Sequence, residues 1–390
     1  MRHEPVVGIE PRIMQWARKT IGLSVEQVAS KLKRPVSSIE AWESGTGAPS
    51  YIELEKLAYN IYKRPLAIFF LPEPPDEVAP IKEFRTLPDI DIQTLYPDTY
   101  LQIRHARAYQ LALNELFDGK NPVAKPIWQY INLYLEKDVA NQAQTIRKFL
   151  SVDIKDQIKW VNDEDALKHW RQAVEETGVF VFKNAFKQKE ISGFCLIDEN
   201  FPIIYLNNST TKTRQIFSLL HELAHLLLNI NGISKFDTTY IERLLGKEKA
   251  IEIFCNAIAA EILIPAADFS EKTNNLSANI EDMPDEYFSK LANQYGVSRE
   301  AILRRIMDQK RINPAFYEQK AKYWTSQKKQ GKGGNWYASQ GTYLSSRFSK
   351  EVISRYYHGQ VTIEQAADFL GINVKNFAGI EQKILSGGDV

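Results

Sequence analysis

Residues 218–229, SLLHELAHLLLN, carry the strongest chemical signal in the chain. Their apolar residues recur with the period of a helix, yet two histidines and one glutamate lie near the centre. Ionisable groups in an apolar helix need partners, because burying them alone costs free energy. His221 and His225 are four residues apart and therefore share one face of a helix, where both imidazoles can bind a single ion. The segment predicts a metal-binding helix.

Residues 221–225 also match H-E-x-x-H, the pattern of the zinc metallopeptidase helix. Glu222 lies too far around the helix to be a third ligand, but it can accept a proton from a water molecule that attacks a substrate. The alternative is a pair of buried or solvated histidines on a core helix. We favour the metal site, because the motif lies in a predicted helix that predicted strands precede.

A catalytic zinc ion requires a third protein ligand and an open fourth position. The next predicted helix, IEIFCNAIAAEILIP at 251–265, has Glu252 and Asn256 on one otherwise apolar face. We predict Glu252 as the third ligand and Asn256 as a hydrogen-bond partner of a ligating histidine ring. Cys255 and Glu261 are alternative ligands, but a free cysteine on an apolar helix is more often a core residue, and Glu261 lies nearer the helix end.

The sequence also offers candidates for substrate contacts. Tyr240 and Arg214 are candidates for holding the oxyanion that forms during peptide hydrolysis. The segment FPIIYLN at 201–207 is either an edge strand that pairs with an extended peptide or an interior strand of the sheet.

The composition bounds the class of protein. A chain of 390 residues is too long for one ordinary domain, and 44% hydrophobic with 25% charged residues is typical of soluble globular proteins. The net charge of +1 gives no overall signal for a nucleic-acid partner. No apolar run is long enough to span a bilayer, so no membrane association is expected. Two cysteines, Cys195 and Cys255, favour a reducing compartment, and we expect a cytoplasmic protein.

Changes in composition and periodicity divide the chain into four segments. Short helices fill residues 1–75 and end at a proline cluster, and residues 76–160 are predicted to form a mostly helical connection. Residues 161–325 hold three predicted strands, GVFVF, ISGFCLI and FPIIYLN, followed by helices. Residues 326–390 combine a Lys/Gly-rich link with a small helical unit. The predicted fold class is α+β, mostly helical, with a small three-stranded sheet.

Three segments share one pattern of core residues: 26–39, 289–302 and 364–377. Each has an alanine, an apolar or aromatic residue three positions later, and another ten positions after the alanine. This spacing is typical of two short helices joined by a tight turn, and Gly296 and Gly371 supply a glycine at the turn of the later copies.

The first copy is part of GLSVEQVASKLKRPVSSIEAWESGTGAPS at 22–50, which resembles the Xre/Cro-type repressor domain. Ser24 can cap the second helix, and Pro35 suits the first turn of the third. The resemblance implies an N-terminal helix-turn-helix bundle whose recognition helix is residues 36–43. One departure is Val25, which stands where the family usually has a base-reading glutamine.

DNA binding by residues 1–75 therefore has arguments on both sides. The residues best placed to contact DNA are Lys33 and Arg34 for phosphates and Ser37 and Ser38 for base edges. The recognition helix, however, carries Glu40 and Glu43 on a face predicted to meet solvent, and no Lys or Arg. The alternative is a module that dimerises or that docks a homologous repressor.

The two helices of the metal site together resemble the ImmA/IrrE family of metallopeptidases. RQIFSLLHELAHLLL at 214–228 is followed by EIFCNAIAAEILIP at 252–265, which is similar to the family's third-ligand helix, E-x-x-x-N ending in AAxLLxP. RPLAIFFLPEPP at 64–75 and EFR at 83–85 are similar to long members with an N-terminal DNA-binding-type domain. The resemblance covers roughly residues 9–310.

This resemblance implies a gluzincin-like fold with His221, His225 and Glu252 as zinc ligands and Glu222 as the general base. Characterised relatives cleave a helix-turn-helix repressor and thereby derepress stress, defence or mobile-element genes. We therefore expect a zinc endopeptidase whose protein substrate is a cognate Xre-type repressor. The alternatives are a DNA-binding regulator or antitoxin whose peptidase-like domain binds or senses a partner, and self-cleavage. Glu222 favours an enzyme, and the sequence leaves the oligomeric state open, a dimer included.

Overall fold

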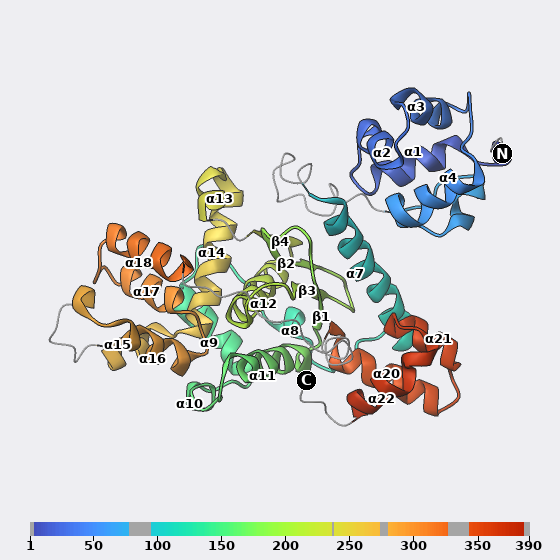
Figure 1. The fold of residues 1–390 in the computed structure, drawn as a ribbon. Helices are drawn as coiled ribbons and strands as arrows, with labels where there is room; N and C mark the ends of the chain where they lie inside the picture. Colours follow the sequence, from blue (N-terminus) through green and yellow to red (C-terminus); the bar gives the residue numbers. More distant parts are fainter. Residues whose placement is uncertain (1–3, 78–94, 236–237, 274–279, 327–342, 386–390) are drawn as a thin grey trace. The chain divides into compact units, whose positions relative to one another are not determined.

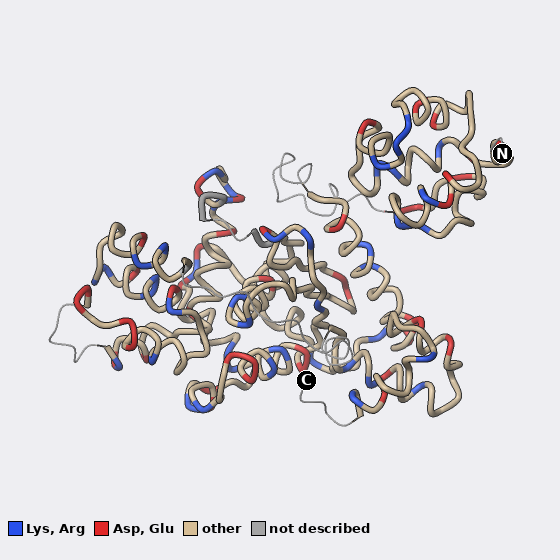
Figure 2. The backbone as a smooth tube through the Cα atoms, viewed as in Figure 1, with Lys and Arg blue, Asp and Glu red and all other residues tan. Residues whose placement is uncertain are grey.

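The computed structural model describes residues 4–77, 95–235, 238–273, 280–326 and 343–385. The described residues within 1–105, together with 186–188, form one compact unit, and those within 106–185 and 189–390 form the other. The described chain is mostly helical and contains a small mixed sheet, which confirms the α+β class (Figure 1). Basic and acidic residues are interspersed through both units (Figure 2). The predicted link at 327–341 and the EFR segment lie outside the described residues.

The first unit is built from short helices. Ser24 caps α2 in a reciprocal capping box with Gln27, as the sequence predicts, and Pro35 precedes the first residue of α3. Ile13, Val28 and Ile39 from three different helices are buried together in its core. The elements are α1 (Pro11–Lys19), α2 (Val25–Leu32), α3 (Val36–Ser44), α4 (Tyr51–Glu55), a π-helix (Lys56–Tyr62), a 3-10 helix (Leu66–Phe70) and the first half of α7 (Pro97–Leu116).

The second unit places one sheet among many helices. Its helices before the sheet are α8 (Ile127–Tyr130), α9 (Val139–Phe149), α10 (Ile154–Gln157) and α11 (Asp163–Glu176). Those after the third strand are α12 (Lys212–Leu227), α13 (Thr238–Arg243), α14 (Gly246–Leu263), α15 (Ala266–Thr273), α16 (Asp285–Tyr295), α17 (Arg299–Asp308) and α18 (Pro314–Ser326). The last helices are α20 (Ser346–Tyr357), α21 (Ile363–Leu370) and α22 (Phe377–Leu385), with short 3-10 turns at Ile280–Asp282 and Val374–Asn376.

Among the described residues the sheet has four strands, so the predicted count of three is wrong. The strands are β1 (Phe180–Asn184), β2 (Ile191–Leu196), β3 (Ile203–Asn207) and β4 (Gly232–Lys235), in the order β1-β3-β2-β4. β3 pairs parallel with β1 and antiparallel with β2, and β2 pairs antiparallel with β4. Of the two alternatives for FPIIYLN, the interior strand is confirmed and the edge strand is wrong, because β3 is hydrogen-bonded on both sides. β4 is the strand next to the metal motif in sequence.

All three recurrent segments form the predicted pairs of short helices. They correspond to α2 with α3, α16 with α17, and α21 with α22, the last pair joined through a 3-10 turn. The residue after the first helix of each pair, Lys33, Gly296 or Gly371, has a left-handed backbone. A left-handed residue at this position reverses the chain direction and ends the helix.

The core of the second unit lies between the sheet and its covering helices. α12 packs against β2 on the sheet and against α11 and α14 (Figure 1). Leu219, Leu223 and Ile258 from these helices are fully buried with Val181 and Ile204 from the sheet. Within the described chain, no single helix is long and apolar enough to cross a membrane; only the bent pair α14 and α15 meets that criterion by length and composition.

Candidate metal centre

The metal motif lies in the middle of α12, with apolar residues around it. Thr211 caps the helix by accepting a hydrogen bond from the backbone N–H of Arg214, and Leu220, Leu223 and Ala224 are fully buried. This packing fixes the positions of His221 and His225, which are 3% and 1% exposed. Because α14 packs on α12, it places Glu252, 7% exposed, against the two imidazoles.

The ligand atoms of these three side chains have the spacing of a tetrahedral metal site. Nε2 of His221 lies 3.1 Å from Nε2 of His225 and 3.4 Å from Oε2 of Glu252. Nε2 of His225 lies 3.2 Å from Oε1 of Glu252. Around a tetrahedral ion with ligand distances of about 2.0–2.1 Å, neighbouring ligand atoms are about 3.3 Å apart. The three residues therefore fit an ion of the size of zinc.

Asn256 fixes the orientation of the first histidine. Its Oδ1 lies 2.9 Å from Nδ1 of His221. An amide oxygen can only accept a hydrogen bond, so Nδ1 carries the proton and donates it. Nε2 of His221 is then left with a lone pair directed at the cluster. The structure thus gives Asn256 the contact that the sequence predicts for it.

Burial and the neighbouring charges act in opposite directions on the pKa of Glu252, the third candidate ligand. Burial would raise the pKa of Glu252, but His225 and His221 outweigh this effect and hold that pKa well below its ordinary value. Burial also opposes the charged form of His225, whereas Cys255 and Glu252 raise the pKa of its imidazole. Glu252 is therefore ionised at neutral pH, and its negative charge can offset a divalent cation.

Glu222 lies against Gly232, the first residue of β4. A Cβ atom added at Gly232 would lie 2.7 Å from the ring of His225 and 3.0 Å from Oε2 of Glu222. The backbone N–H of Gly232 donates to Sγ of Cys195 at 3.3 Å. Burial and the charge of Glu222 raise the pKa of Cys195 well above its ordinary value, so the thiol stays neutral. A glycine at 232 is thus what allows the strand to approach the cluster.

Sequence reasoning missed Gly232 and Cys195. The available signal was a glycine that begins a short segment just after the metal helix, since glycine in a strand often marks a close approach of backbone. The contact itself could not be predicted, because it joins β2, α12 and β4 through the pairing of the sheet.

The alternative ligands lie outside the three-residue cluster. Cys255 is fully buried beside His225, and burial raises the pKa of its thiol. Glu261 accepts a hydrogen bond from the backbone N–H of Ala266 at 2.9 Å and pairs with Arg305. Glu261 is thus occupied at the end of α14.

The two oxyanion candidates remain predictions. Arg214 stacks over Phe217, with 5.8 Å between the guanidinium carbon and the ring centroid, and burial lowers its pKa to about 10. The ring of Phe217 lies 6.2 Å from that of His221, so Arg214, Phe217 and His221 follow one side of α12. The side chain of Tyr240 lies outside the described residues.

The candidate DNA contacts in the first unit do not converge as the metal cluster does. Lys33 and Ser37 are exposed, Ser38 is half-buried, and Arg34 pairs with Glu53. The expectation that Glu43 faces solvent is wrong: its side chain is 7% exposed and accepts hydrogen bonds of 2.6 and 2.8 Å from Arg18. Of the two acidic residues in α3, only Glu40 is exposed.

Comparison with known proteins supports the metal centre. Residues 174–307 match the model of the Peptidase_M78 family, described as the IrrE N-terminal-like domain. The matched region contains the whole sheet, the His221–His225–Glu252 cluster and Glu222. This part of the chain is therefore similar to ImmA/IrrE-type peptidase domains. No curated protein matches the chain.

Proposed function

We propose that this protein is a zinc-dependent endopeptidase that cleaves a regulatory protein. The observation that carries the proposal is the buried cluster of His221, His225 and Glu252 beside Glu222, within the region that matches a peptidase family. A module that only bound a partner would have no need of a carboxylate next to two ligating histidines. The full H-E-x-x-H set therefore favours catalysis over sensing.

When bound, zinc supplies Lewis-acid chemistry, because it polarises a carbonyl group and makes a water molecule more acidic. The residues of the chain perform the proton transfers and the positioning. Glu222 accepts the proton of the attacking water and delivers it to the leaving nitrogen. Asn256 holds the ring of His221 through its Nδ1–H, and Glu252 remains ionised so that the site carries negative charge.

We propose β4 as the strand that receives the substrate. It is the last strand in the sheet order, and Gly232 brings its first residue against His225 and Glu222. An extended peptide can add to such an edge through main-chain hydrogen bonds, which hold its backbone without selecting side chains. A peptide paired with β4 would run past the cluster.

The substrate that we propose is an Xre-type helix-turn-helix repressor, whose cleavage would derepress stress, defence or mobile-element genes. The support is the resemblance of residues 22–50 to that repressor class. Homologous domains often pair through matching surfaces, so a repressor-like unit on the protease offers a docking site for the repressor. The same unit is our candidate for any DNA contact.

The test is cleavage of an Xre-type repressor, and a repressor gene found next to this one would supply the first candidate substrate. Purified full-length protein, loaded with zinc, is incubated with the repressor, and intact-mass spectrometry follows the products. We expect two fragments that sum to the repressor, no cleavage after treatment with a chelator, and recovery when zinc is added back. Stable binding of the repressor without cleavage by the zinc-loaded protein would favour the sensing alternative.

A further inference from the structure

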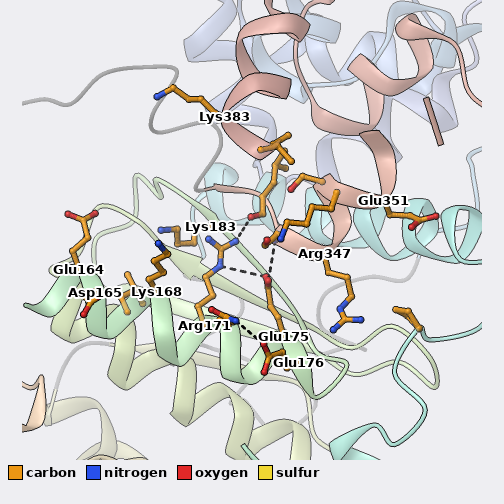
Figure 3. Close-up of a pocket in the computed structure, with 18 of the residues that line it drawn as sticks. Glu164, Asp165, Lys168, Arg171, Glu175, Glu176, Lys183, Arg347, Glu351 and Lys383 are labelled. Atoms are coloured by element: carbon orange, nitrogen blue, oxygen red, sulfur yellow. Dashed lines mark hydrogen bonds and ion pairs between the residues drawn. The ribbon is translucent and has the colours of Figure 1, made fainter. Parts of the chain in front are cut away.

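A second candidate binding site lies in a cavity of about 1010 Å³ whose lining includes no member of the metal cluster. It is enclosed by α11, the end of β1 and the C-terminal helices α20 and α22 (Figure 3). Of the described residues that line it, seven are Lys or Arg and five are Asp or Glu. Leu167, Leu344 and Ile384 add apolar surface. The cavity is large enough for a small organic molecule and has an excess of positive charge.

Lys183 is the unusual side chain of this cavity. It lies on β1 and is 6% exposed, and it shares a face of the strand with Val181, a core residue. Among the contacts of the described residues, its ammonium group has no carboxylate partner. Burial lowers the pKa of Lys183 well below its ordinary value, and the nearby charges of Arg171 and Lys212 act in the same direction, while those of Glu164 and Glu175 oppose them. Such a group is stabilised when an anion enters the cavity.

The carboxylates around the cavity are already engaged. Glu175 accepts a hydrogen bond of 3.2 Å from the backbone N–H of Ser346 and lies 3.7 Å from Nε of Arg171. The other acidic side chains have these partners: Glu164 pairs with Lys212, Glu351 with Arg355, Glu176 with Gln172 and Asp165 with His169. Arg347 and Lys350 on α20, like Lys183, have no carboxylate partner among the described contacts. Positive charge therefore remains available on two sides of the cavity (Figure 3).

We propose that this cavity binds a small organic phosphate, with the phosphate group held at Lys183 and with Arg347 adding attraction for the anion from the other side of the cavity. Ammonium and guanidinium groups are the usual partners of phosphate oxygens, and a buried amine gains most from a ligand with a double negative charge. The volume far exceeds that of a free inorganic anion, so an organic part of the ligand would contact Leu167, Leu344 and Ile384. The proposal does not depend on peptidase activity.

The cavity also connects distant parts of the second unit. Arg171 on α11 donates to the carbonyl oxygens of Val181 on β1, at 2.7 Å, and of Leu344 just before α20. Lys212, the first residue of α12, lines the cavity as well. A ligand held here would bridge the C-terminal helices and the helix that carries His221. This gives the C-terminal helices a binding role.

The test is calorimetric titration of the full-length protein with ribose 5-phosphate and adenosine 5′-monophosphate. Inorganic phosphate, ribose and adenosine are the control ligands. Inorganic phosphate lacks the organic part, and ribose and adenosine lack the phosphate group. We expect at least one organic phosphate to bind, and to bind more tightly than any of these three. Lys183→Met keeps the length of the side chain and removes its charge, so it should weaken binding at least tenfold. Lys189→Met removes an exposed lysine outside the cavity lining and should leave binding unchanged.

Arg347→Gln provides a second variant on the opposite side of the cavity, and it decides the matter if Lys183→Met does not fold. It should also weaken binding of the organic phosphate. The proposal is overturned if neither organic phosphate binds, or if the folded Lys183→Met or Arg347→Gln variant binds as tightly as the wild type. Equal binding of adenosine and its monophosphate would overturn it too, because recognition would then not involve the phosphate.

Discussion

The side chains of the metal cluster on α12 and α14 are buried, whereas the candidate DNA contacts Lys33, which follows α2, and Ser37, which lies on α3, are not. His221, His225 and Glu252 are each at most 7% exposed and lie with their ligand atoms against one another. Lys33 and Ser37 are exposed to solvent. Both sets occupy short sequence motifs, yet only the first set brings its side chains together within the chain.

This difference shows what a motif can establish by itself. Buried ionisable groups must satisfy one another or bind a ligand, so their convergence restricts the chemistry to a few choices. Exposed groups are satisfied by water, and their role depends on a partner that the chain does not contain. Experiments on the cluster should therefore give large losses, and experiments on α2 and α3 small ones.

His221→Ala should have the largest effect, because it removes a ligand and leaves two groups that cannot hold the ion. Metal analysis of the purified wild type should give about one equivalent of zinc per chain, and the variant should lose it together with all cleavage. His358→Ala, which removes an exposed histidine, should keep the metal. Full metal content in His221→Ala would contradict the assignment of the cluster.

Glu222→Gln should slow turnover severely and keep the metal, because the amide cannot accept the proton while all three ligands remain. The loss should be about 10²- to 10⁴-fold in the rate of repressor cleavage. Glu136→Gln, at an exposed position, is the matched control and should cleave normally. Normal cleavage by the Glu222 variant would mean that another group is the base.

Gly232→Ala tests whether the approach of β4 is part of the site. The added Cβ would lie 2.7 Å from the ring of His225, so the ring or the strand must move. A displacement of that kind should lower the cleavage rate by about 10²-fold. Gly47→Ala, whose Cβ would meet no atom closer than 3.5 Å, is the control for a glycine substitution. If Gly232→Ala cleaves at the wild-type rate, β4 does not position the site.

Asn256→Ala should weaken zinc binding by about 10- to 100-fold, because Nδ1 of His221 loses its acceptor. Asn256→Asp keeps an oxygen in the same place and should restore most of the affinity. Competition with a chromogenic chelator measures both values. A loss that aspartate does not restore would indicate that Asn256 acts through packing and does not orient His221.

The parts of the fold that the sequence predicted depend on local periodicity. The H-E-x-x-H helix, the E-x-x-x-N helix and the three helix pairs each repeat a pattern within a few turns, and a helix places residues four apart on one face. The three metal ligands could be predicted because both helices carry their polar residues on otherwise apolar faces. The pairing of those helices was supplied by the family resemblance.

The features that the sequence did not predict depend on pairing between distant segments. β4 has only four residues and begins with glycine, which weakens any strand signal. The sequence left open whether β3 is an interior or an edge strand, and only the order of the strands shows that it lies inside the sheet. Glu43 was assigned to solvent because its partner, Arg18, lies on another helix.

Substitutions in the first unit are expected to have the smallest effects. They show whether its exposed residues contact DNA or dock a repressor. Arg34 already pairs with Glu53, so Lys33 is the better probe of a phosphate contact. If the unit binds DNA, Lys33→Glu should weaken binding to all duplexes and lower the slope of affinity against salt by about one. Lys63→Glu is a close control, because Lys63 is exposed and shares the left-handed backbone of Lys33. A gel-shift titration at two salt concentrations measures both variants.

If the unit instead docks a repressor, the same substitution should leave cleavage nearly unchanged, while deletion of residues 1–75 should slow it.

The burial of Glu43 removes one of the two charges that argued against DNA binding, but the other, Glu40, is exposed and α3 has no cation. We therefore expect the first unit to bind DNA weakly, in a salt-sensitive way and without distinguishing sequences, since phosphate contacts carry no base information. Tight binding to one sequence by the wild type would contradict this expectation and would assign base reading to Ser37 and Ser38.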